Sequence, residues 1–144
     1  MTTSNLQAVK VAIFEQLALR PGLADTTVVY KPKREFPDRC IYGGGLNATQ
    51  NISAGRTGAD TTRDENGTIT IHVRVLLKGE DADVAEAAVV ALGAEIEAYL
   101  AATDPAVLGL LNASITAFAV NSEYTDDAVV GYGSWTIQTE SYYG

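Results

Sequence analysis

The sequence is poor in the residues from which disulfides, metal sites and nucleophilic triads are built. It contains one cysteine, Cys40, and one histidine, His72. A single thiol cannot form an internal disulfide, and a lone histidine cannot complete a triad or bind zinc without further ligands. The two residues could meet across neighbouring strands, but no feature near either one supplies an oxyanion donor. We therefore expect no enzyme activity, no metal site and no cofactor.

Long apolar runs are also missing. The longest, at 87–92 and 106–111, fall far short of the roughly 20 residues that a membrane helix requires. The first six residues show neither the basic start nor the apolar core of a secretion signal. We therefore expect a chain that folds in a cytosol and has no membrane partner. A length of 144 residues with 47% apolar and 19% charged residues is typical of a single globular domain, 1–144.

Positive charge is missing from the second half of the chain. All ten lysines and arginines lie in residues 1–78, beside seven acids, so that this segment carries a formal charge of +3 (ten minus seven). Residues 79–144 contain eleven acids and carry −11. An acidic protein is poorly suited to grip nucleic acid through its phosphates. The division instead favours a contact between the basic half of one copy and the acidic half of another.

The basic residues gather before and within one polar stretch. They could form no more than a solvated surface. They could also form an electrostatic contact with an acidic neighbour, and head-to-tail contacts of that kind close into rings. We adopt the second interpretation and predict a subunit interface that contains Lys31, Lys33, Arg34, Arg39, Arg56 and Arg63.

Two segments have the apolar spacing of helices. The first is predicted at about 5–19, with Lys10, Glu15 and Gln16 facing water. The second begins at a cap on Asp81 or Asp83 and continues to about residue 102. Its expected core stripe consists of Val84, Ala88, Leu92, Ile96 and Leu100, with Val89 and Tyr99 at the edges.

Five segments have the composition of strands, namely 26–30, 39–42, 68–77, 114–120 and 134–139. The third is the clearest, because apolar and polar residues alternate along it and one face must be buried. The order is α-β-β-β-α-β-β. Runs of strands beside helices predict an α+β fold, with a mostly antiparallel sheet and two helices packed on one face.

Residues 46–67 are polar and contain almost nothing to bury, so we predict a long loop there that serves as an assembly arm. Gly43–Gly45 precede it and are expected to form a flexible exit from the strand. They lack the motif of a phosphate-binding loop. The acids at 80–86 lack the ligand spacing of a calcium loop and are interpreted as a helix cap with a solvated face.

The layout can be followed through short signatures along nearly the whole chain. A helix ends near Arg20-Pro21-Gly22, and a proline-containing segment leads into Arg39-Cys40-Ile41-Tyr42-Gly43. The alternating strand follows the polar stretch. An alanine-rich helix with Ile96-Glu97-Ala98-Tyr99-Leu100 then leads into Leu108-Gly109, and the last strand holds Trp135-Thr136-Ile137. In this order the chain resembles the tail terminator, or tail completion, proteins of long-tailed, siphovirus-like bacteriophages.

The resemblance implies a structural virion protein without catalytic residues or cofactor. Its copies would form a homo-hexameric ring that caps the tail tube, ends tail elongation and joins the tail to the head connector. The implied partners are the tail tube protein and a connector or neck protein. DNA would pass through the lumen without specific binding, and the ring would belong to the tail and neck of a virion assembled in the host cytoplasm.

We add the hypothesis that Glu123, Asp126 and Asp127 contribute to an acidic lumen, because a ring that DNA crosses should not hold it. Two alternatives stay open. The chain could be another phage neck, head-closure or tail tube protein. It could also be a small intracellular ligand-binding α+β domain.

Overall fold

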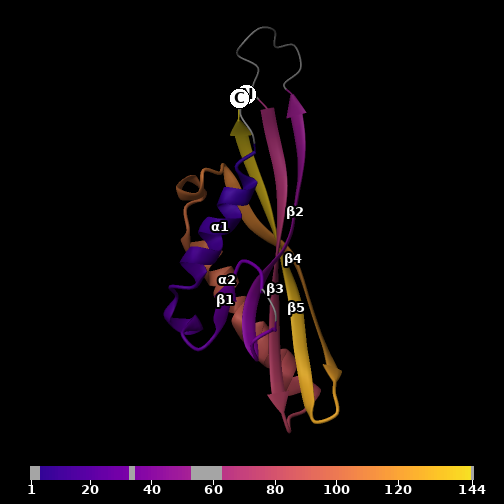
Figure 1. Ribbon diagram of the computed structural model, residues 1–144. Helices are drawn as coiled ribbons and strands as arrows, with labels where there is room; N and C mark the ends of the chain where they lie inside the picture. The colour runs from indigo at the N-terminus through magenta and orange to yellow at the C-terminus, as the bar shows by residue number, and fades with distance from the viewer. Residues whose placement is uncertain (1–3, 33–34, 53–62, 144) are drawn as a thin grey trace.

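Five strands form one sheet in the computed structural model, which describes residues 4–32, 35–52 and 63–143 (Figure 1). The order across the sheet is β1-β2-β3-β5-β4, and all neighbours are antiparallel except β1 and β2, which run parallel. The strands are β1 (Thr27–Val29), β2 (Arg39–Ile52), β3 (Arg63–Lys78), β4 (Asn112–Tyr124) and β5 (Ala128–Tyr143).

Both long helices cover the same face of this sheet (Figure 1). They are α1 (Leu6–Leu17) and α2 (Ala82–Ala102), and each is followed by a short 3-10 turn, η1 (Pro21–Leu23) and η2 (Pro105–Leu108). The predicted α+β fold, with its element order and mostly antiparallel sheet, is therefore confirmed.

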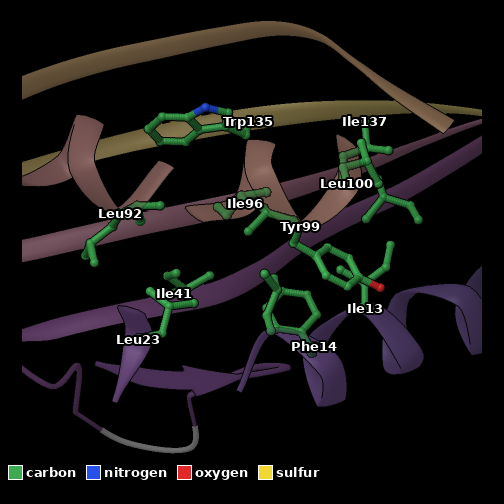
Figure 2. Close-up of a cluster of buried hydrophobic side chains, with 14 of the residues drawn as sticks. Ile13, Phe14, Leu23, Ile41, Leu92, Ile96, Tyr99, Leu100, Trp135 and Ile137 are labelled. Atoms are coloured by element: carbon green, nitrogen blue, oxygen red, sulfur yellow. The ribbon is translucent and has the colours of Figure 1, made fainter. Parts of the chain in front are cut away.

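The core lies between the helices and the sheet, as Figure 2 shows in close-up. The odd-numbered residues of β3 from Ile69 to Val75 are fully buried, while their even-numbered neighbours face the other side. This alternation is the one that the sequence predicts. Trp135 and Ile137 of β5 continue the same layer, and Leu92, Ile96 and Tyr99 of α2 pack on it.

Two details of the helices differ from the prediction. On α2 the buried stripe begins at Ala85 and Val89, whereas Val84 is exposed. The absence of a side chain at Gly131 of β5 lets the helix lie close to the strand, since a Cβ there would stand 2.7 Å from the carbonyl oxygen of Ala85. On α1, Lys10 does not face water but is buried.

The prediction of a loop at 46–67 is wrong at both ends of that segment, which form strands. Residues 46–52 continue β2 and pair with β3 as far as Arg63, and β3 also pairs there with the end of β5. The polar composition led to the wrong prediction, because these residues are polar on both faces and their order comes from backbone hydrogen bonds within the sheet. The segment 53–62 lies outside the described residues. Gly43–Gly45 are likewise not an exit from the strand but an irregularity inside β2, where the register shifts between Gly43 and Leu46.

Candidate interaction surfaces

The two residues that could carry chemistry are both held in structural contacts. Cys40 is fully buried, and burial raises the pKa of its thiol, although Arg74 opposes this shift. The reactive thiolate is therefore disfavoured at neutral pH. His72 Nδ1 lies 2.7 Å from Ser134 Oγ, and the ring of His72 lies 5.1 Å from that of Tyr42. Burial lowers the pKa of His72, with a smaller contribution from Lys10.

Lys10 forms the most unusual polar contact of the core. Its Nζ donates to the carbonyl oxygen of Gly44 at 2.7 Å and lies 3.9 Å from the centre of the Tyr30 ring. Gly44 belongs to the irregular part of β2, between Gly43 and Leu46, where the regular pairing with β3 is interrupted. Lys10 therefore links α1 to β2 just beyond the residues of β2 that pair with β1.

The second face of the sheet is covered by no helix in the part of the chain that the structure describes (Figure 1). Its middle is neutral and polar, and the register places Thr70 and His72 of β3 beside Ser134 and Thr136 of β5. Cations lie toward one end of this face, at Arg74 and Lys78.

Three strands extend beyond the helix layer and form what we call the arm, made of 44–52, 63–67 and 139–143 (Figure 1). Its side chains are mostly polar on both faces. Most of the arm is exposed, but three of its polar side chains are buried, those of Glu65 (2% exposed), Thr139 and Ser141. The Ser4 hydroxyl donates to Glu65 Oε1 at 2.7 Å. Hydrogen bonds, rather than apolar packing, hold the arm together.

The sheet ends in two long edges. β1 covers β2 only from Cys40 to Tyr42, so that 44–52 form the outer edge of the arm. At the other side, β4 is the edge, and none of its thirteen residues is buried. Phe118 of β4 stacks on Trp135 with 5.7 Å between ring centroids, yet 59% of its surface remains exposed.

An apolar groove accompanies each edge on the side that carries the helices. The groove beside β4 has a volume of about 460 Å³, and Leu100, Ile115, Phe118 and Glu97 are among the residues that line it. A second groove of about 370 Å³ lies between α1 and β1. Aliphatic and aromatic side chains dominate both. They suit another protein surface better than a polar small molecule, which would need several converging polar groups.

The predicted acidic residues come together in space. Glu123 lies near the end of β4, and Asp126 and Asp127 form the tight turn to β5, all three exposed. This turn lies at the end of the sheet opposite the arm (Figure 1).

The predicted basic interface is not one patch. Lys31 is exposed beside β1, and Arg39 is half-buried at the start of β2. Arg63 begins β3 at the far end of the arm. It is twelve residues along β3 from Val75, which pairs with Arg39, a separation of about 40 Å at strand spacing. Lys33, Arg34 and Arg56 lie outside the described residues.

Sequence reasoning missed the edges, the grooves and the buried lysine. The edges could have been found from composition, because neither 43–52 nor 112–122 contains a charged residue or a proline. Those are the residues with which proteins normally protect sheet edges. Nothing in the sequence distinguishes Lys10 from a lysine on a wet helix face.

No protein-family model matches the sequence, and the search of curated proteins found no significant match. Among the described residues no group of three or more His, Cys, Asp or Glu side chains is placed to hold a metal ion. No helix in the described part of the chain is both long enough and apolar enough to span a membrane.

Proposed function

We propose that this chain is a structural virion protein of a long-tailed bacteriophage. Its copies form a hexameric ring that caps the tail tube, ends tail elongation and joins the tail to the head connector. The observation that carries the proposal is the arm, because a thin and polar extension has no use in an isolated domain. The layout of the sequence, which resembles that of tail terminator proteins, supports the same function.

The arm supports assembly for a physical reason. Two or three strands without an apolar face are marginally stable on their own in water. Here the strands are nevertheless ordered, and Glu65 is satisfied on both oxygens, since Gln50 Nε2 donates to Oε2 at 2.9 Å. The arm thus reaches beyond the core in a defined shape. A ring subunit that must touch both its neighbours and a tube needs such a projection.

Oligomeric state and tube binding test the proposal together. Light scattering on the purified chain should give the mass of six 15.2-kDa subunits, and negative-stain images should show rings with a central opening. Added to tail tubes of a long-tailed phage that lacks its own terminator, the protein should bind at one tube end and allow joining to filled heads. A protein that neither forms rings nor binds tubes would overturn the proposal. Rings that stack along the whole tube would favour a tail tube protein instead.

We also propose that the β4–β5 turn contributes negative charge to the lumen. The double change Asp126→Lys and Asp127→Lys should leave ring formation intact, because both residues are exposed and the change touches no buried contact. It should slow DNA passage, because the new cations attract phosphates. Ring mass and the rate of DNA ejection from assembled particles are the two measurements. An unchanged ejection rate in intact rings would place the turn outside the lumen.

A further inference from the structure

The two long edges of the sheet have matched properties. The outer edge of the arm, 44–52, and the first eleven residues of β4, 112–122, are both free of charged residues and proline. Natural edge strands are usually blunted by such residues, because unpaired N–H and C=O groups invite pairing with another chain. β4 contains one irregularity, between Ile115 and Ala117, and then pairs regularly with β5 from Ala117 to Tyr124. Both edges thus retain straight stretches that can accept a strand.

The directions of the strands are also compatible. β2 is antiparallel to β3, β3 to β5 and β5 to β4, so β4 runs opposite to β2. Copies related by rotation about an axis roughly along the strands keep their orientation. The β4 edge of one copy would therefore meet the β2 edge of the next in antiparallel fashion, and a contact of this heterologous kind closes into a ring.

Side chains next to the edges fit the same arrangement. On the helix-bearing side of β2, Leu46 is 36% exposed beside a groove that it shares with Leu6. On the same side of β4 lies the groove of Leu100, Ile115 and Phe118. Pairing of the edges brings these apolar surfaces together and continues the core from one copy to the next.

Charge does not oppose this contact. Neither 44–52 nor 112–122 contains a charged residue, so no like charges meet when the two edges pair.

We infer that the β4 edge of one copy pairs with the arm edge, 44–52, of a second copy, in an antiparallel extension of the sheet. This inference rests on the proposed ring and names the surfaces that build it. The occupant of each edge is the opposite edge of the same protein, and not an unrelated peptide.

Paired lysines test each edge on its own. One variant carries Ala117→Lys and Ala119→Lys on β4, and the other carries Asn47→Lys and Thr49→Lys on β2. All four positions are exposed and face the uncovered side of the sheet. Each variant should raise the dissociation constant for self-association at least about tenfold. The matched control, with Ala91→Lys and Ala94→Lys on the exposed side of α2, should assemble like the wild-type chain. Far-UV circular dichroism and the urea midpoint of each monomer show that its fold is intact.

A mixture of the two edge variants gives the decisive result. Each retains one functional edge, so neither assembles alone, but an equimolar mixture should form one-to-one dimers and nothing larger by analytical ultracentrifugation. If a β4 or β2 variant assembles like the wild type, or if the mixture stays monomeric, the edge pairing is wrong, while wild-type rings would leave the proposed function standing. A wild-type chain without self-association at any concentration overturns the edge pairing as well. Binding to tail tubes then decides the proposed function separately.

Discussion

Gly93 is the point at which the Trp135 ring of β5 packs against the backbone of α2, and its replacement by alanine gives a sharp test of the packing. A Cβ at this position would lie less than 3.0 Å from three ring atoms of Trp135. The indole cannot yield easily, because 1% of Trp135 is exposed and Phe118 stacks on it. Either α2 must lift away from β5 or the indole must leave its site.

The magnitude follows from two opposing terms. Overpacking of a dense core costs about 1–3 kcal/mol. Alanine stabilises the interior of a helix by up to about 1 kcal/mol relative to glycine. Because the clash involves a rigid ring, we take the upper part of the first range and expect Gly93→Ala to lower the free energy of unfolding by about 2 kcal/mol. For a chain of this size that corresponds to a fall in Tm of roughly 4–8 °C.

Urea unfolding at one protein concentration, followed by far-UV circular dichroism, measures the effect. Ala91→Gly, at an exposed position of α2, measures the difference in helix propensity between alanine and glycine alone. In a Trp135→Leu background the clash is removed, so that Gly93→Ala should become neutral or stabilising, and the double-mutant cycle should show a coupling of about 2–3 kcal/mol. A Gly93→Ala chain as stable as the wild type in the Trp135 background would refute the packing described here.

Two further predictions concern polar contacts. Burial lowers the pKa of His72, so below about pH 6.5 the unfolded chain binds more protons than the folded chain. The stability that His72 contributes above that pH is therefore lost as the pH falls. In His72→Gln the difference in unfolding free energy between pH 7.5 and 5.5 should be smaller than in the wild type, and an equal difference would contradict the assignment. Lys10→Met keeps the length of the side chain but leaves the Gly44 carbonyl without its donor, which should cost about 1–3 kcal/mol in urea unfolding. The same change at the exposed Lys31 should cost almost nothing, and similar losses at both positions would argue against the contact.

The sequence predicted the elements whose periodicity is strong and missed those whose order has another origin. The alternation around Ile71 specifies one buried face, and the predicted strand there is confirmed. The predicted buried face of α2 was displaced, because Val84 and Val89 are equally apolar in the sequence. Val89 is the one that packs against the glycines of β5, Gly131 and Gly133, and no local pattern marks that contact. Lys10 was placed in water because an isolated cation on a helix usually lies there. Its partner is a carbonyl oxygen more than thirty residues away, which no local pattern can indicate.

The arm escaped prediction for a different reason, and that reason bears on its use. Its strands are polar on both faces, so no alternation marks them, and their order comes from backbone pairing on both sides of β3 and from the bonds that Glu65 accepts. Order of this kind leaves the outer edge hydrated and uncharged, open to one more strand. A flexible loop of the same composition would lose conformational entropy on binding. A strand that is already extended loses much less, and more of its pairing energy remains for association. The same residues that conceal the arm from sequence analysis therefore make it suited to join one copy to the next.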